Sequence, residues 1–346
     1  MAKNNGSGSV LIMRFSALGD VAMTIPCVYD VCRNHPDRQF VFLTRTFPAR
    51  LFVNAPENLV VRGIDTADYK GVRGLLRLFR GLRQEFNIDC VVDLHDVLRT
   101  QILRKFALMS GITVRHIDKG RTEKRALTRK NRKVLKQLEP TIERYRDTLR
   151  RAGLDITSSF HSIFETKAAD ASLFAKASSD KKSVERWYGI APFAKHPGKI
   201  LPVETMRKVV DALKTVDNVK IFLFGGGEKE NAILQQWSGE NVVNMAELKI
   251  GLEGELALMS RLDAIVTMDS ANMHFASLVG TRAVTVWGAT HPFAGFMGHG
   301  QCIKDAVQLP LPCRPCSIFG NKPCHLGDYP CLAGITPDAI LRLLTP

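Results

Sequence analysis

Long hydrophobic runs are missing from this 346-residue sequence, although 45% of its residues are hydrophobic. No stretch approaches the roughly 18 uncharged apolar residues that a membrane span needs, and the opening MAKNNGSGS lacks the apolar core of a signal peptide. We therefore expect neither membrane insertion nor secretion, but a cytoplasmic protein with reduced thiols. The length favours two domains.

The common fingerprints of dinucleotide and nucleotide binding are missing too. The turn FGGGEKE at 224–230 follows a predicted strand, but it does not form a GxGxxG pattern, and no GxxxxGK[ST] loop occurs. A nicotinamide dehydrogenase would explain an α/β architecture but not this absence. The glycine turn by itself is a weak signal of a nucleotide site.

Acidic residues are too few to balance the basic ones, since 48 Lys and Arg against 34 Asp and Glu give a net charge of +14. Ten of the basic residues, against two acidic ones, lie between Arg115 and Lys136. This excess indicates an anionic partner: a nucleic acid, a phosphorylated metabolite or an acidic membrane surface. The segment has no aromatic side chain on which bases could stack, which disfavours a nucleic acid. A solvated basic surface is the alternative.

The hydrophobic pattern predicts an α/β protein with parallel sheets. Apolar, β-branched runs alternate with amphipathic stretches, and 71–86 is predicted to be a helix with a basic face. The rhythm breaks at 156–186, where we expect an interdomain linker. Strands are predicted at 10–15, 40–44, 59–63, 88–94, 187–193, 219–224, 264–268 and 283–287, with helices at 202–213, 228–237 and 270–279.

Three polar turns follow predicted strands, where open α/β sheets bind ligands. In SALGDV, Asp20 lies near the start of a helix, and an ordinary helix cap is the alternative. The loop APFAKHPGKILP contains Lys199, which could bind a diphosphate; a solvent-exposed loop lysine is the alternative. In VTMDSANMHFA, Asp269 and His274 lie where unpaired helix N–H groups favour a phosphate, although His274 also suits an ordinary first-turn position.

The cysteines are crowded near the end of the chain. Four of them suggest a structural zinc site, with buried free thiols or a disulfide as alternatives: Cys313, Cys316, Cys324 and Cys331. Only the first pair has the CxxC spacing of a zinc knuckle.

Taken together, LIMRFSALGDVAMTIP, APFAKHPGKILP and MDSANMHFASLVGTRAVTVWGATHP with the following CxPC segment resemble glycosyltransferase family 9, the ADP-heptose:lipopolysaccharide heptosyltransferases. The match runs from residue 10 to about residue 345. It implies a GT-B fold, in which two Rossmann-like domains with parallel sheets face each other across a cleft. We expect an acceptor domain at 8–170, a nucleotide-sugar domain at 171–335, and a C-terminal helix at 336–346 that packs back on the first domain.

The resemblance also implies an activity: inverting transfer of a heptose or related sugar from an ADP-sugar to a lipopolysaccharide inner-core acceptor, without a covalent intermediate. Asp20 would be the base and Lys199 would hold the diphosphate, and no cofactor or catalytic metal is expected. The remaining donor contacts would be Glu228 (or Glu230), Asp269, Ser270, Ala271 and His274, with Ala271 standing where many family members have glycine. The acceptor contacts would be Ser16, Gly19, Arg99, Arg121, Lys124 and Arg125.

The expected partners follow from that activity. They are an ADP-sugar, an anionic lipopolysaccharide or lipid A–Kdo acceptor, and the cytoplasmic face of the inner membrane, with no nucleic acid. The competing hypotheses are a non-catalytic lipopolysaccharide-binding relative and a basic nucleic-acid-binding α/β protein.

Overall fold

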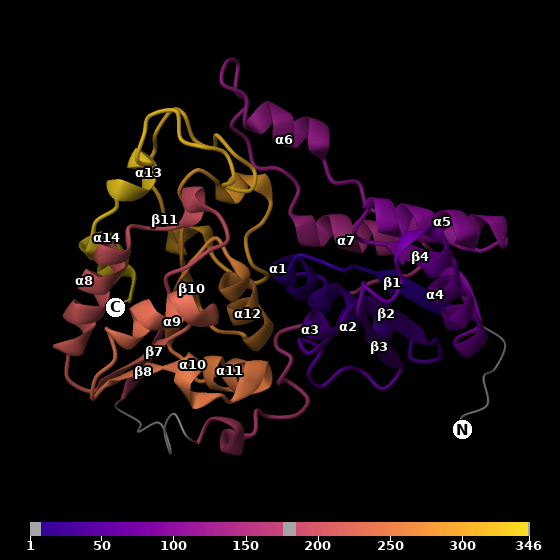
Figure 1. The fold of residues 1–346 in the computed structure, drawn as a ribbon, viewed down its shortest axis with the longest axis horizontal. Coiled ribbons are helices and arrows are strands. Elements are labelled where there is room, and N and C mark those ends of the chain that lie inside the picture. The colour runs from indigo at the N-terminus through magenta and orange to yellow at the C-terminus, as the bar shows by residue number, and fades with distance from the viewer. Residues whose placement is uncertain (1–7, 176–184, 345–346) are drawn as a thin grey trace. The chain divides into compact units, whose positions relative to one another are not determined.

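The computed structural model describes residues 8–175 and 185–344, and the chain forms two compact units. The first unit holds 1–119 and 141–163, and the second holds 120–140 and 164–346. Each unit is an α/β layer structure around a parallel sheet (Figure 1). No helix within the described residues is long and apolar enough to cross a membrane.

The first unit has a five-stranded sheet in the order β3-β2-β1-β4-β5. Its strands are β1 (Ser9–Met13), β2 (Phe40–Arg45), β3 (Leu59–Ile64), β4 (Ile88–Asp93) and β5 (Thr113–His116). Its helices are α1 (Leu18–Ala22), α2 (Ile25–Asn34), α3 (Thr46–Ala49), α4 (Gly71–Glu85), α5 (Leu98–Met109) and α7 (Thr141–Arg150). Every residue of β1 is buried, as expected for a central parallel strand covered on both faces. Helices α4 and α5 cover the face that carries Leu11 and Met13.

The second unit has a six-stranded sheet in the order β11-β10-β9-β6-β7-β8. Its strands are β6 (Arg186–Ala191), β7 (Val219–Leu223), β8 (Val242–Asn244), β9 (Ala264–Met268), β10 (Ala283–Val286) and β11 (Ala306–Val307). Its α-helices are α6 (Arg121–Leu127), α8 (Val203–Lys214), α9 (Gly227–Gln235), α10 (Met245–Leu248), α11 (Gly251–Met259), α12 (Ala271–Val279), α13 (Pro330–Ala333) and α14 (Pro337–Leu344). Short 3₁₀ helices are η1 (Ala171–Phe174), η2 (Pro197–Lys199), η3 (Pro292–Ala294) and η4 (Ile303–Asp305).

The predicted strands and helices are present, with ends that differ by up to two residues. The predicted strand at 264–268 coincides with β9, and the predicted helix at 71–86 is α4. The sequence pattern missed β5, β8 and β11, which are edge or near-edge strands of two to four residues. Short strands of this kind carry too few residues for a periodic signal.

Domain organisation differs from the expectation in three places. Residues 120–140, expected in the first domain, pack on the second unit, where the Leu138 amide donates to the Phe293 carbonyl at 2.9 Å. The C-terminal helix, expected against the first domain, contributes Ile340 and Leu344 to the second unit's core instead. The boundary expected at residue 170 lies beyond the point where the two units divide, at 163 and 164.

The expected linker at 156–186 is only partly irregular. Its first residues are tied to the first unit, because the Thr157 amide donates to Asn34 at 2.6 Å and Ser159 donates to the buried Asp30. Further along, η1 packs on α11 of the second unit. The stretch 176–184 of this prediction lies outside the described residues.

Candidate active site

In the first unit the strand order reverses between β1 and β4. The chain continues from β1 toward β2 on one side of the sheet and from β4 toward β5 on the other, so this is the switch point of the sheet. Ligands of open α/β sheets bind outside the carboxyl ends of the strands at such a point. Ser16 and His95 lie in the turns that follow β1 and β4, and Asp20 lies in the first turn of α1, so the fold brings these residues to one edge.

Asp20 is held at this edge by the neighbouring Ala17 and Arg14. The Ala17 amide donates to Oδ2 of Asp20 at 3.1 Å, and the Arg14 guanidinium forms an ion pair with the same oxygen at 3.1 Å. Asp20 therefore does cap the start of α1, as the alternative interpretation expected, but its side chain is still 28% exposed. A carboxylate fixed in this way remains accessible to a ligand.

Arg14 is a buried organiser of the first unit's edge. It donates to the Leu94 carbonyl and lies 5.5 Å from the centre of the Tyr145 ring. Burial by itself would lower the pKa of Arg14, but Asp20, Tyr145 and Asp93 together outweigh it and the pKa is raised. The Arg14 guanidinium therefore stays charged and orients the Asp20 carboxylate through the ion pair.

His95 lies beside the β1 turn as a neutral side chain. Burial first, and then the positive charges of Arg14 and Lys119, lower its pKa to about 3. The Phe15 amide donates to Nδ1 at 3.3 Å, so the proton is assigned to Nε2, which is 3.4 Å from Oγ of Ser16. In this arrangement His95 donates to Ser16, and the Ser16 hydroxyl proton can turn toward a ligand.

The β4 turn that carries His95 is fixed by the buried Asp93. Its carboxylate accepts the amides of His95 and Asp96, both at 2.9 Å, and forms an ion pair with Arg104 at 3.4 Å. Lys119 donates to the Asp96 carbonyl at 3.0 Å. The site edge is therefore a connected polar network rather than a set of independent side chains.

The second unit repeats this layout. Its switch point lies between β6 and β9, and the loops after these strands carry Lys199 and Asp269. Nζ of Lys199 lies 2.8 Å from Oδ2 of Asp269, with side chains 15% and 4% exposed. Asp269, predicted as a donor contact, is thus mainly the counter-ion that holds Lys199.

Lys199 is also fixed by the cysteine-rich segment. The Gly198 amide donates to the Gly320 carbonyl at 3.2 Å, and the Ala289 amide donates to the Gly198 carbonyl at 2.8 Å. Gly320 has φ +72°, and a Cβ there would lie 2.6 Å from Cγ of Lys199. Arg314, buried among carbonyls that include those of Trp287 and Thr290, secures the loop that contains Ala289.

The predicted helix N-terminus is present at the same edge. Ser270 precedes α12 and lies 3.2 Å from the Thr267 hydroxyl, Ala271 is its first residue, and His274 is buried. On α9, which follows β7, Glu230 accepts the Gly226 amide at 2.8 Å, whereas Glu228 is exposed in the first turn. Glu228 is thus the freer of the two carboxylates to meet a ribose.

The predicted acceptor residues divide between the units. Ser16 and Gly19 lie beside Asp20, and Arg99, at the start of α5, donates to the Tyr69 carbonyl at 3.2 Å. Arg121, Lys124 and Arg125 lie on α6 of the second unit, where Lys124 contacts the Phe296 ring at 4.4 Å. These three residues belong to the second unit, whereas Asp20 belongs to the first.

The four late cysteines are free thiols. No three His, Cys, Asp or Glu side chains in the described part of the chain are grouped so as to hold a metal ion. The arrangement gives the zinc site no support, and zinc stays a prediction. Of the four, Cys331 alone is buried, and burial raises its pKa to about 11, whereas Cys313, Cys316 and Cys324 are half-buried.

Several site residues were missed from the sequence. Arg14 lies inside the quoted first motif, and a charge directly after an apolar strand was the available signal. His95 likewise follows a predicted strand, in DLHD. Tyr145 and Gly320 give no local signal, because their roles depend on contacts with residues more than a hundred positions away.

Comparisons with known proteins agree with this architecture. The sequence model of glycosyltransferase family 9 (heptosyltransferase) matches residues 75–317. A search of curated proteins gives no match.

Solved structures show the same fold over nearly the whole chain. E. coli heptosyltransferase WaaC with ADP-2-deoxy-2-fluoro heptose has 17% identity, covers 97% of this chain and 98% of its own, and gives a TM-score of 0.64. E. coli ADP-heptose lps heptosyltransferase II has 18% identity, 97% coverage of both chains and a TM-score of 0.71. The family 9 glycosyl transferase from Veillonella parvula DSM 2008 has 16% identity, 97% and 96% coverage and a TM-score of 0.71. The chain therefore belongs to glycosyltransferase family 9, the heptosyltransferases, and is a glycosyltransferase of GT-B fold.

Proposed function

We propose that the protein transfers a heptose, or a closely related sugar, from an ADP-sugar to an inner-core lipopolysaccharide acceptor with inversion at the anomeric carbon. ADP as the donor nucleotide is supported by the family and by the ADP and ADP-heptose analogue named with WaaC. The net charge of +14 suits substrates that carry phosphates and Kdo carboxylates.

In this mechanism Asp20 is the general base. Its exposed carboxylate accepts the proton of the attacking acceptor hydroxyl, while the Arg14 ion pair fixes its direction. Ser16, which receives a hydrogen bond from neutral His95, donates its own proton to an acceptor oxygen. The anomeric C–O bond breaks as the new one forms, and the electron pair leaves with ADP, so no covalent enzyme intermediate is needed.

The second unit receives the departing diphosphate. Lys199 and the N-terminal N–H groups of α12 stabilise its charge, and Glu228 hydrogen-bonds the ribose. Asp269 keeps Lys199 in place but offsets part of its charge. Because these groups can carry the diphosphate, we expect EDTA to leave transfer intact.

The acceptor side uses the basic helix α6 as well as the Asp20 edge. Arg121, Lys124 and Arg125 attract the acceptor phosphates, with Arg99 as a further contact at the start of α5. An acceptor embedded in lipid places the enzyme at the cytoplasmic face of the inner membrane.

The observation that carries this proposal is the pairing of a positioned, exposed Asp20 at one switch point with Lys199 at the other. The test is incubation with ADP-heptose and a Kdo–lipid A acceptor, with mass spectrometry of the product and NMR of its anomeric configuration. UDP- and GDP-sugars are the controls. Transfer from a UDP-sugar in preference, retention of configuration, or binding of lipopolysaccharide without turnover would each overturn the proposal.

A further inference from the structure

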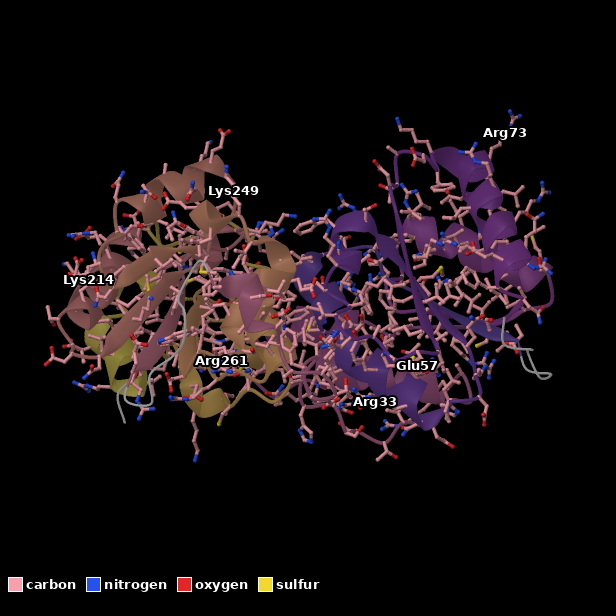
Figure 2. The ribbon with its side chains drawn as sticks, turned by 90° about the horizontal axis from the view of Figure 1, so that it is seen from below. Arg33, Glu57, Arg73, Lys214, Lys249 and Arg261 are labelled. Carbon is pink, nitrogen blue, oxygen red and sulfur yellow. The ribbon has the colours of Figure 1, made fainter. Side chains whose placement is uncertain are left out.

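Helix α4 presents a row of arginines on the outer side of the first unit. Arg73, Arg77 and Arg80 recur at helical spacing, Arg83 flanks them, and all four are exposed. Figure 2 shows Arg73 pointing away from the helix into the surroundings. The one acidic residue of α4, Glu85, is occupied by an ion pair with Arg62.

These arginines form few interactions with the rest of the described residues. Arg77 donates to the Asp68 carbonyl and stacks on the Tyr69 ring, but Arg73, Arg80 and Arg83 form no hydrogen bond or ion pair there. Between the arginines is a hollow of about 440 Å³, lined by Arg73, Leu76, Arg77, Arg80, Gly81 and Gln84. A hollow lined by arginines can bind anionic head groups, whereas clustering these like charges does not stabilise the fold.

Exposed aliphatic side chains lie on the neighbouring helix. Helix α5 packs against α4 through the ring pair Phe79–Phe106, at 6.2 Å, and Figure 1 shows the two helices on the same side of the unit. Leu98 and Met109 share one face of α5 and are 74% and 84% exposed. Such exposure of large apolar side chains, beside arginines and without aromatics, needs an explanation.

We propose that the outer surface of α4 and α5, the α4–α5 face, binds the anionic surface of a lipid bilayer. The arginines contact lipid phosphates, and the aliphatic side chains of α5 enter the head-group region. This names the membrane contact surface for the proposed transfer to a lipid-borne acceptor and rests on that function, although bilayer binding can be measured without it.

The chemistry of the α4–α5 face favours a bilayer over the other polyanions. A single-stranded nucleic acid would use aromatic stacking platforms, and the large exposed apolar side chains of α4 and α5 are all aliphatic. An acidic protein would match the arginines of α4 but not the exposed aliphatic side chains of α5. A bilayer with anionic lipid satisfies both through charge and partial burial.

The test is flotation of the full-length protein with vesicles of phosphatidylcholine containing about one third phosphatidylglycerol, and with pure phosphatidylcholine vesicles. We expect binding only to the anionic vesicles. Since each basic side chain near such a surface contributes about fivefold, R73Q/R80Q/R83Q should lower partitioning roughly 100-fold. The loss should shrink between about 0.1 M and about 1 M salt, as the Debye length falls from about 10 Å to about 3 Å.

Two further variants separate the contributions. K208Q/K249Q/K304Q removes the same charge from exposed positions of the second unit and should bind vesicles within about threefold of wild type, since these lysines are not part of the α4–α5 face. L98Q/M109Q should weaken binding several-fold, and that loss should persist at high salt because it is apolar. Circular dichroism and thermal melts check that each variant is folded.

Transfer to a deacylated, water-soluble acceptor keeps this proposal separate from the proposed function. R73Q/R80Q/R83Q should retain wild-type turnover there, because these arginines are outside the site edge. Equal vesicle binding by wild type and R73Q/R80Q/R83Q, an equal loss in the second-unit control, or tighter binding to an oligonucleotide through the same arginines would each overturn the bilayer assignment. Absence of turnover with intact vesicle binding would instead contradict the proposed function.

Discussion

The two units place an ion pair at the same point of their sheets but use it differently. In the first unit Arg14 is buried and its carboxylate partner Asp20 is exposed, whereas in the second the carboxylate Asp269 is buried and Lys199 is the more exposed partner. The exposed member of each pair is the one that can meet substrate. One fold thus offers a negative group at one edge and a positive group at the other, and the buried partner sets the sign.

Replacing Asp20 with Asn breaks the first half of this comparison and should have the largest effect. If Asp20 is the base, turnover should fall by about 10²- to 10⁴-fold, or roughly 3 to 5.5 kcal/mol of barrier, because the amide cannot take the proton. The Kd for ADP should change by less than about threefold. Steady-state kinetics and calorimetric titration with ADP measure the two quantities.

The neutral amide of the Asp20→Asn variant leaves Arg14 buried without its counter-charge, so this substitution should also cost about 1 to 3 kcal/mol of unfolding free energy. R14M/D20N removes both charges and should recover part of that stability without recovering turnover. Wild-type turnover per folded molecule in Asp20→Asn would reduce Asp20 to a helix cap.

Lys199→Ala breaks the second half, with the opposite pattern. Binding of ADP should weaken about 10- to 100-fold, equivalent to about 1.4 to 2.8 kcal/mol, because the cation is lost and Asp269 faces the diphosphate uncompensated. K199M/D269N, which removes both charges, should bind ADP more tightly than Lys199→Ala does. Unchanged ADP affinity in Lys199→Ala would show that the cation serves the fold alone.

His95 makes the stability of the first unit's site edge depend on pH. Its pKa of about 3 in the folded state lies below the value of about 6.5 expected when unfolded, so the unfolded chain binds the extra proton. Stability from this group is therefore lost as pH falls from about 6.5 toward 3, by about 2 kcal/mol at pH 5.

His95→Gln should make the unfolding free energy less dependent on pH over that interval, as followed by urea denaturation at pH 7.5 and pH 5. His116→Gln, at an exposed position on β5, is the matched control and should leave the slope unchanged. Equal slopes in wild type and His95→Gln would mean that His95 is protonated in the folded protein.

Gly320→Ala sharpens the comparison with the smallest expected effect. Its φ of +72° and the approach of Cβ to Lys199 should cost about 1 kcal/mol of stability and weaken ADP binding about threefold. Gly327→Ala is the control, since φ is +92° but nothing lies within 4 Å of the added Cβ. It should lose similar stability and keep its ADP affinity. Equal ADP affinity in both variants would remove Gly320 from the support of Lys199.

Much of this arrangement could be predicted from local pattern. The alternation of apolar runs with amphipathic stretches predicted parallel α/β architecture, and polar turns after strands placed Asp20, Lys199 and Asp269 at sheet edges. The basic face of α4 was also predicted from the sequence. These features depend on residues within about one helical turn or one strand, and hydrophobic periodicity indicates structure over that range.

Partnerships between distant residues could not be predicted. Lys199 and Asp269 meet because β6 and β9 are neighbours, although β7 and β8 intervene in the chain. His95 reaches Phe15 and Ser16 because β1 pairs with β4. Strand order depends on which hydrophobic faces bury each other, and no local pattern contains that information.

The sequence by itself therefore determined the types of the longer strands and helices that it predicted, the chemistry available at their turns and the excess of positive charge. The tertiary structure decided which turns share an edge, which member of each ion pair stays exposed, and that 120–140 packs with the second unit. The physical reason is that local structure follows from side-chain periodicity and turn stereochemistry. Pairing across the sheet, in contrast, follows from the joint burial of residues that are far apart in the chain.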